Sequence, residues 1–174
     1  MANIWVISDT HINHANILKF KDSEGNLIRG SRFANTREMD ECILENWNSV
    51  VKPGDKVYHL GDVMFGDREY FQKFWPRFHG SKRLTPGNHE DIKYLSSGGF
   101  FAQVQLWRVF SDFGLVLSHF PLHESQLYDY KRDRPLKSVH GHVHTNSLNS
   151  DKHINVSAEV VNYTPVNIEE LRIY

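Results

Sequence analysis

Residues 4–11 read Ile-Trp-Val-Ile-Ser-Asp-Thr-His. The first four form an apolar run without alternation, which predicts a short strand that is buried on both faces. Asp9 and His11 follow directly after this strand. Open α/β sheets bind their ligands beyond the carboxyl ends of the strands, so these two side chains predict a binding site at that edge of a sheet.

The residues that follow predict alternating helices and strands. Residues 36–51 are predicted to form a helix because apolar residues recur in them at helical spacing, with Asn35 as the N-cap and Glu38 three residues later. After it come a predicted strand over 56–60, a helical stretch near 67–75 and a strand near 82–85. This order predicts a parallel sheet with right-handed crossovers.

The second half of the chain is richer in predicted strands. They cover residues 102–106, 108–110, 115–117, 137–139 and 154–156. Since no linker, repeat or low-complexity segment interrupts the sequence, we expect residues 1–174 to form one α/β domain.

Metal-ligand residue types stand in five short clusters, each just past a predicted strand. The clusters are Asp9-Thr10-His11, Gly61-Asp62, Gly87-Asn88-His89-Glu90, Ser118-His119 and Gly141-His142-Val143-His144. Because the ends of parallel strands meet at one edge of a sheet, side chains from all five segments can converge there. Histidines that only fill a core would instead fall at strand centres.

These residue types suit a centre that holds two metal ions. Such a centre needs a carboxylate that can bridge the ions, and Asp62 fits that part. On an extended backbone Asp9 and His11 would point to one face, as would His142 and His144. Two ions about 3.5–4 Å apart can hold a hydroxide at neutral pH and bind phosphoryl oxygens.

Composition excludes several other classes of protein. The net charge is -1, so long nucleic acid is not favoured as a partner. Cys42 is the single cysteine, which excludes an internal disulfide and a zinc ribbon. No apolar run approaches the roughly 20 residues of a membrane span, and no leader-like start is present. We therefore expect a cytoplasmic protein with no membrane association and no obligate protein partner.

The ordered clusters, with their neighbouring residues, resemble the calcineurin-like metallophosphoesterase superfamily. Four longer stretches of the sequence are similar to the motifs of its small, single-domain bacterial and phage-encoded members. They are Ser8-Asp9-Thr10-His11-Ile12-Asn13-His14, Tyr58-His59-Leu60-Gly61-Asp62, Ser118-His119-Phe120-Pro121-Leu122 and His140-Gly141-His142-Val143-His144-Thr145-Asn146. The resemblance runs from residue 4 to about 165. It implies a four-layer α/β/β/α sandwich, in which two mixed sheets are flanked by helices.

The resemblance also implies a division of ligands. One metal would take Asp9, His11, Asp62 and His144, and the other would take Asp62, Asn88, His119 and His142. A hydroxide bridging the ions would attack phosphorus, and His89 would protonate the leaving oxygen as general acid. A positioned acid of this kind contributes about 10²–10⁴-fold in rate.

One segment departs from the pattern of the family. Many family phosphatases carry an Asp that orients the catalytic histidine and an Arg that binds the phosphate, both shortly after the bridging Asp. Here residues 63–68 read Val-Met-Phe-Gly-Asp-Arg, which does not keep that spacing. Asp67, Arg68 or Glu90 could substitute. The missing arginine favours diesters, which carry one charge fewer than monoesters.

Further residues are candidates for contact with the substrate. They are Asn88, His89, His14, Arg29 and Arg32. The ranges 22–33 and 122–135 carry arginines or tyrosines that suit phosphates and bases, although charged loops of this kind are more often only solvated. His14, His59, His123 and His140 lie beside motifs, where they could support ligands or neighbouring strands.

We therefore predict a phosphoesterase that depends on two divalent ions and acts on nucleotide-like or other small phosphodiesters. Mn²⁺ is the expected metal, with Fe, Zn, Ni or Mg as alternatives. The alternative functions are a phosphomonoesterase with the same site and a non-catalytic metal-binding scaffold for protein interactions. A metallo-β-lactamase-type hydrolase is excluded, because Thr145-Asn146 follow His144 where an Asp-His pair would be needed.

Overall fold

The parallel sheet predicted from the first half of the chain is present in the computed structural model, which describes residues 2–146 and 148–174. Its strands are β1 (Ile4–Ile7), β2 (Lys56–His59), β3 (Ser81–Leu84), β4 (Gln103–Val104) and β11 (Val166–Asn167). They lie in the order β11-β1-β2-β3-β4. Strands β1 to β4 run parallel, and β11 pairs antiparallel with β1.

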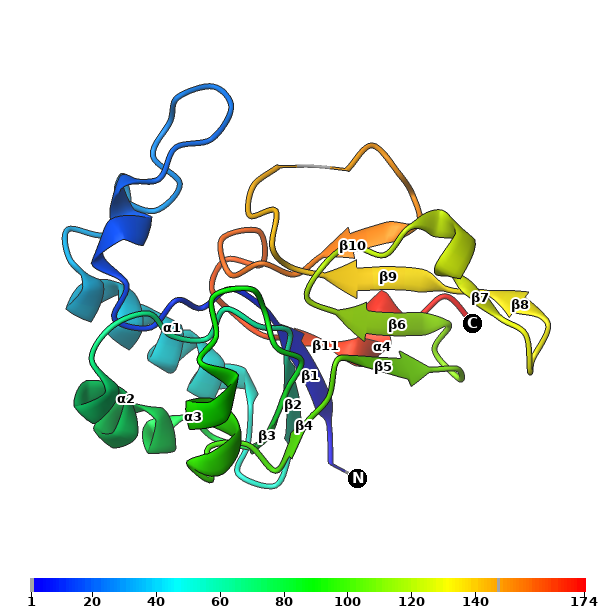
Figure 1. Cartoon of the computed structure of the whole chain (residues 1–174), viewed down its shortest axis with the longest axis horizontal. Coiled ribbons are helices and arrows are strands. Elements are labelled where there is room, and N and C mark those ends of the chain that lie inside the picture. The colour runs from blue at the N-terminus through cyan, green and yellow to red at the C-terminus, as the bar shows by residue number, and fades with distance from the viewer. Residues whose placement is uncertain (1, 147) are drawn as a thin grey trace.

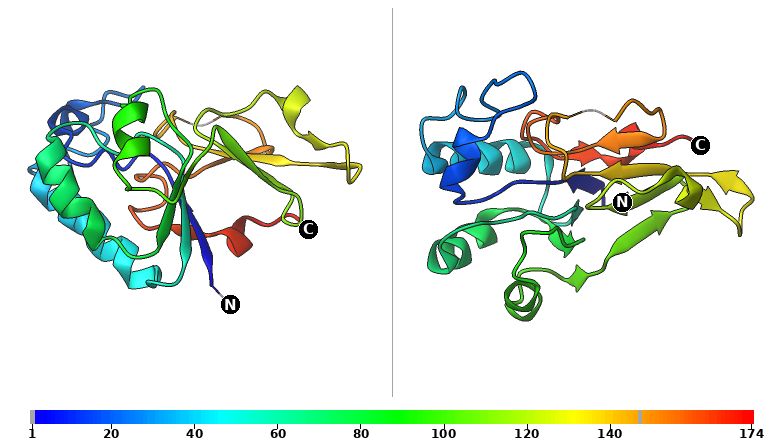
Figure 2. Two further views of the ribbon diagram at one scale, coloured as in Figure 1. Left: turned by 60° about the horizontal axis from the view of Figure 1, so that its bottom comes forward. Right: turned by 45° about the horizontal axis from the view of Figure 1, so that its top comes forward.

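Helices connect the parallel strands and cover one face of this sheet (Figures 1 and 2). They are α1 (Thr36–Val50), α2 (Arg68–Phe74) with the 3-10 turn η2 (Trp75–Arg77), and α3 (Ile92–Ser97). A 3-10 turn, η1 (Ala15–Lys19), precedes α1. The predicted cap of α1 is confirmed: Asn35 Oδ1 accepts from the Glu38 amide at 2.9 Å. The Glu38 carboxylate in turn accepts a hydrogen bond from the amide of Ala34, the residue before the N-cap.

The second sheet is mixed, as predicted. Its strands are β5 (Trp107–Phe110), β6 (Leu115–Ser118), β9 (Lys137–His140) and β10 (His153–Asn155), in the order β10-β9-β6-β5. Strands β6, β9 and β10 run parallel, whereas β5 is antiparallel to β6. The remaining elements are η3 (Glu124–Gln126), the hairpin β7 (Tyr128–Asp129) and β8 (Arg134–Pro135), and α4 (Ile168–Leu171).

The predicted four-layer sandwich is confirmed, and its layers differ in thickness. On the outer face of the second sheet, Val116 packs against Leu127 and Leu136 of the segment that carries η3 and the hairpin. No long helix covers that face among the described residues. The helix layer on the first sheet is much deeper, and most of the core lies there.

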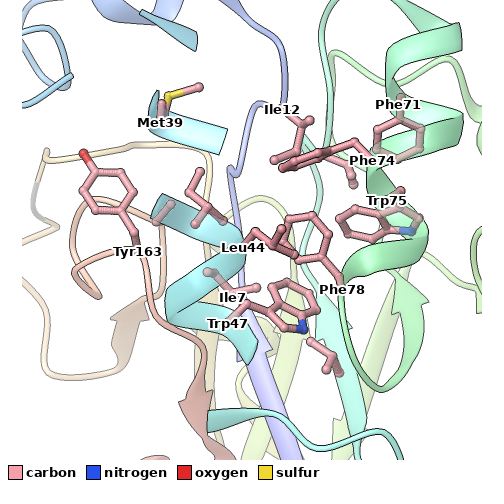
Figure 3. Close-up of a cluster of buried hydrophobic side chains, with 14 of the residues drawn as sticks. Ile7, Ile12, Met39, Leu44, Trp47, Phe71, Phe74, Trp75, Phe78 and Tyr163 are labelled. Atoms are coloured by element: carbon pink, nitrogen blue, oxygen red, sulfur yellow. The ribbon is translucent and has the colours of Figure 1, made fainter. Parts of the chain in front are cut away.

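Strand β1 contributes apolar side chains to both cores, which explains its unbroken apolar run. Ile7 belongs to the cluster between the first sheet and the helices, and Val6 to the cluster between the two sheets. Figure 3 shows the first of these clusters, in which Trp47, Trp75 and Phe78 pack together. Both Val6 and Ile7 are fully buried.

Trp47 should be the costliest single truncation in this core. Its side chain is fully buried, it packs edge-on against Trp75 and Phe78, and its indole N–H donates to the His79 carbonyl at 3.0 Å. Trp47→Ala should therefore lower the free energy of unfolding by about 3–5 kcal/mol, as measured by urea unfolding. Trp107→Ala is the matched control, because that indole is 59% exposed, and should change it by less than about 0.5 kcal/mol. Equal effects of the two variants would contradict this packing.

No helix among the described residues is long and apolar enough to cross a bilayer.

The feature that positions the site is the direction of the strands. The carboxyl ends of β1, β2 and β3 in one sheet and of β6 and β9 in the other open toward the same region (Figure 1). All five clusters follow these ends.

Candidate metal centre

Left-handed turns bring the predicted ligands together. Nine non-glycine residues in the described chain have positive φ, and five of them are predicted ligands. The five are Asp9, His11, Asp62, His142 and His144, with φ between 50° and 69°. Such conformations cost on the order of 1–3 kcal/mol each and cluster at functional sites. The expectation of extended backbone at Asp9-Thr10-His11 and His142-Val143-His144 was wrong, because each segment turns toward the centre instead.

The first half of the centre is built on Asp9, His11 and His144. One ligand atom from each lies within 4.8 Å of the others. His11 Nε2 is 3.9 Å from Asp9 Oδ1. Both of these atoms are buried without a hydrogen-bond partner in the described structure. Buried polar atoms without partners are costly, and a divalent cation would satisfy both at once.

The second half is built on Asn88, His119 and His142. Asn88 Oδ1 lies 3.0 Å from His119 Nε2 and 3.0 Å from His142 Nδ1. Two donor atoms bound at right angles to one ion at about 2.1 Å each lie about 3.0 Å apart. The spacing therefore fits three ligands on one cation.

Asp62 lies between the two halves. Its Oδ2 is 3.7 Å from His11 Nε2 and also 3.7 Å from His119 Nε2. Its other oxygen, Oδ1, accepts from the backbone amide of His89 at 3.2 Å. One carboxylate oxygen thus faces a histidine of each half, which is the placement that a bridging ligand needs.

Outer hydrogen bonds orient three of the four histidines. His119 Nδ1 donates to the Leu60 carbonyl at 2.7 Å, and His144 Nδ1 donates to Glu159 Oε1 at 2.7 Å. His11 Nδ1 shares a proton with His14 Nδ1 at 3.0 Å. Since each outer nitrogen is engaged, each Nε2 is left as the atom that faces the centre. Burial, reinforced by the Arg29 charge, lowers the pKa of His11 well below its usual value, which keeps that ring neutral.

Arg29 does not have the role that the sequence suggested. Its side chain is fully buried and donates to the carbonyls of Asp9 and Thr10 and to Glu159 at 2.9 Å. Burial opposes ionisation of Glu159, but Arg29 and His144 hold its pKa at about 2. Arg29 therefore braces the Asp9 turn from inside the protein, and its placement argues against contact with the substrate.

Two further predicted substrate residues, His14 and Arg32, have partners within the protein. His14 is buried, with its ring between those of Phe20 and Phe65, and its polar contact is with His11. Arg32 donates to Asn162 Oδ1 at 2.6 Å and lies over the Tyr163 ring. Contact of either residue with the substrate stays a prediction.

His89 and Asn88 are exposed at the mouth of the centre, where a substrate can reach them. The His89 ring lies 6.4 Å from the ring of His11 and 5.7 Å, edge-on, from that of Phe65 (centroid distances). No side chain hydrogen-bonds to the His89 ring in the part of the chain that the structure describes. Apolar contact with Phe65 is what holds this ring laterally.

None of the three proposed substitutes for the family Asp and Arg takes that role in the structure. Asp67 caps α2 by accepting from the Tyr70 amide. Arg68 pairs with Asp91 at the surface. Glu90 accepts from the backbone amides of residues 63 and 87, and burial raises its pKa to about 7.

His59 is a brace between the first two clusters. It is fully buried, and burial lowers its pKa to about 3, so its ring is neutral. The Gly61 amide donates to its Nδ1 at 3.2 Å, so its Nε2 donates to Thr10 Oγ1 at 2.9 Å. The Thr10 hydroxyl in turn donates to the Val63 carbonyl at 2.8 Å. Of the alternatives open for His59, support of the ligand turns is the one its contacts favour.

Two residues that support the centre were not predicted. Asp9 Oδ2 accepts hydrogen bonds from Ser157 Oγ at 3.1 Å and from the backbone amide of His142 at 3.0 Å. The other carboxylate oxygen of Asp9, Oδ1, is left free for a metal ion. Glu159 orients His144, as described above. Both follow the strand predicted at 154–156, so the rule that polar residues after a strand end are candidates would have found them. Gly141 is needed beside them, because a Cβ there would lie 2.1 Å from Asp9 Oδ2.

Comparison with known proteins agrees with this architecture. The family model for calcineurin-like phosphoesterases matches residues 2–163. An uncharacterized protein of Methanocaldococcus jannaschii is 32% identical over 178 residues, which cover 97% of this chain and 89% of that protein. The gene 66 protein of Mycobacterium phage L5 is 27% identical and covers 83% of this chain and 79% of its own length.

A solved structure is also similar. The crystal structure of a protein of unknown function from Aquifex aeolicus matches with a TM-score of 0.73 at 28% identity, covering 98% of each chain. The family match covers all five clusters and every strand of the two sheets except β11. The chain therefore belongs to the calcineurin-like phosphoesterase family.

Proposed function

We propose that this protein hydrolyses small phosphodiesters with the help of two divalent ions. The observation that carries the proposal is the placement of Asp62 Oδ2, at 3.7 Å from a histidine of each half of the centre. Family membership supports metal-dependent hydrolysis of phosphoesters. The seven proposed ligands are Asp9, His11, Asp62, Asn88, His119, His142 and His144.

The donor set fits two such ions. When bound, the ions would supply Lewis acidity, which activates water near neutral pH and neutralises charge on the phosphoryl oxygens. Asp9 and Asp62 are the only charged ligands, so two divalent cations leave a net positive site for an anionic ester. Nitrogen and oxygen donors of this kind suit Mn²⁺, Fe, Zn, Ni or Mg, and we propose Mn²⁺ first.

His89 is positioned to act on the departing oxygen. Its backbone amide is anchored to Asp62 Oδ1, and its ring is exposed beside the centre. An imidazolium there can deliver a proton to the alcohol that leaves phosphorus. Asn88, the preceding residue, places the same loop against the second half of the centre.

The arginines support a diester rather than a monoester. A monoester dianion carries one more charge, for which a bidentate guanidinium is the usual partner. Arg29 is enclosed by backbone carbonyls, and Arg32 and Arg68 are paired with Asn162 and Asp91. The side chains of these three arginines thus have partners within the protein.

The test is hydrolysis of bis(p-nitrophenyl) phosphate and of p-nitrophenyl phosphate by metal-stripped protein to which Mn²⁺, Ni²⁺, Zn²⁺ or Mg²⁺ is returned. The proposal predicts metal-restored cleavage of the diester with little cleavage of the monoester. A preference for the monoester would make the protein a phosphatase. No turnover despite full metal occupancy would favour the scaffold alternative.

Glu159 offers a test of the outer hydrogen bonds. Glu159→Gln keeps the size of the side chain but removes the charge that faces Arg29 and His144. Because such outer partners tune ligand orientation, the affinity for Mn²⁺ should fall about 10–100-fold in a chelator competition assay. Glu124→Gln, whose carboxylate pairs with exposed Lys152, is the control and should not change it. Unchanged affinity in Glu159→Gln would contradict the role of this residue.

A further inference from the structure

We infer that a pocket beside His89 receives the leaving group of the substrate, and that this group carries a single uncharged planar ring. The pocket, called here the Phe65 pocket, is lined by Met64, Phe65, His89, Tyr94 and Leu95. The inference rests on the proposed phosphodiesterase function and specifies its substrates: aryl esters and pyrimidine nucleosides are leaving groups of the required kind.

The size of the Phe65 pocket sets the size of the group. Its volume is about 190 Å³. A dry apolar cavity of about 150 Å³ is large enough to bind benzene. The pocket is therefore large enough for one six-membered ring.

The walls of the pocket favour an uncharged group. Phe65, Met64 and Leu95 contribute apolar surface. At the rim Arg68 forms an ion pair with Asp91, and its guanidinium lies 4.7 Å from the centroid of the Tyr94 ring. Because the two rim charges cancel, the pocket offers no net charge to a second phosphate. A planar ring can instead stack on Phe65 or Tyr94.

The hollow beside His142 and His144 has the opposite character. It is larger, about 710 Å³, and Lys19 and Lys21 line it together with Phe20. Two ammonium groups suit anionic portions of a substrate. The contrast between the two cavities gives the centre one side without net charge and one basic side.

The direction of the reaction places the leaving group on the side of the Phe65 pocket. In hydrolysis of the diester, a bond forms between the water oxygen and phosphorus while the bond from phosphorus to the leaving oxygen breaks. That oxygen takes its proton from His89 and departs as an alcohol, and the protons of the water pass to solvent. Since the leaving oxygen must meet His89, and His89 lines the Phe65 pocket, the group attached to that oxygen enters this pocket.

Two substrates that share a methyl group but differ in the leaving group test the inference. In methyl 2,2,2-trifluoro-1-phenylethyl phosphate the leaving group has a ring, in methyl 2,2,2-trifluoroethyl phosphate it has none, and both leave as alcohols that need a proton. Phe65→Ala should lower kcat/KM about tenfold for the ester with the phenyl ring and less than about threefold for the trifluoroethyl ester, followed by fluorine NMR. Tyr130→Ala, an exposed aromatic residue in the turn between β7 and β8, is the control and should change neither.

Equal losses with both substrates would overturn the inference, because Phe65 would then act only by holding the His89 ring. No loss with either substrate would overturn it as well. Absence of turnover by the metal-loaded wild-type protein would count against the proposed function, and NMR mapping with methyl 2,2,2-trifluoro-1-phenylethyl phosphate would still decide the pocket. Shift changes at residues 64–68 and 91–95 would support it, and changes confined to 19–28 and 142–146 would refute it.

Discussion

His89→Asn is expected to lower turnover of an alkyl phosphodiester about 10²–10⁴-fold while leaving metal content unchanged. The reason is geometric: the His89 ring is exposed beside the centre and is not one of the seven proposed ligands. Asparagine keeps a polar side chain of similar reach but cannot donate a proton as an acid. Turnover is measured under saturating Mn²⁺, and metal content by elemental analysis of the same sample.

The dependence on the leaving group distinguishes acid catalysis from loss of structure. A nitrophenolate departs without needing a proton, whereas an alkoxide needs one, so the loss in His89→Asn should be much smaller with a p-nitrophenyl ester. His79→Asn is the matched control, since that exposed ring bonds only to the Val51 carbonyl, and should retain full turnover. A uniform loss with every leaving group, or a loss below tenfold, would contradict the role of His89 as general acid.

Asp62→Asn is expected to remove the most function of any single change. Asp62 Oδ2 faces His11 and His119 at 3.7 Å each, so the substitution removes a negative charge from both halves of the centre. The stabilisation that metal ions give a phosphoryl transition state amounts to several kcal/mol, so activity should fall by at least about 10³-fold. The bound Mn²⁺ should fall below two ions per chain by elemental analysis.

Asp67→Asn is the control for Asp62→Asn. Asp67 lies five residues on and caps α2, and asparagine is an equally good N-cap, so both metal content and activity should stay near the wild-type values. If Asp62→Asn retained two ions and more than a tenth of the activity, Asp62 would not be the bridging ligand.

The parallel strands and their polar ends were predictable because their signals are local. The apolar run of β1, the cap of α1 and the residues after each strand are all read within a few positions. The two-residue strands β7, β8 and β11 and the short α3 and α4 were not predicted, because they are defined mainly by pairing and packing with distant segments.

The convergence of the five clusters was predicted better than the residues that support them. A cluster such as Gly61-Asp62 can be recognised from adjacent residues alone, and the structure brings all five clusters together. The pair of Arg29 with Glu159 joins residues 130 positions apart, which no local pattern indicates. An arginine in a glycine-containing loop was for that reason expected at the substrate, although burial places it beneath the ligand turns.

We propose that two divalent ions lie side by side at the carboxyl ends of the strands, with Asp62 between them. Anomalous X-ray diffraction from crystals of the protein grown with Mn²⁺ measures this most directly. We expect two manganese peaks about 3.5–4 Å apart, one beside Asp9, His11 and His144 and the other beside Asn88, His119 and His142. A single peak, or peaks away from Asp62, would contradict it.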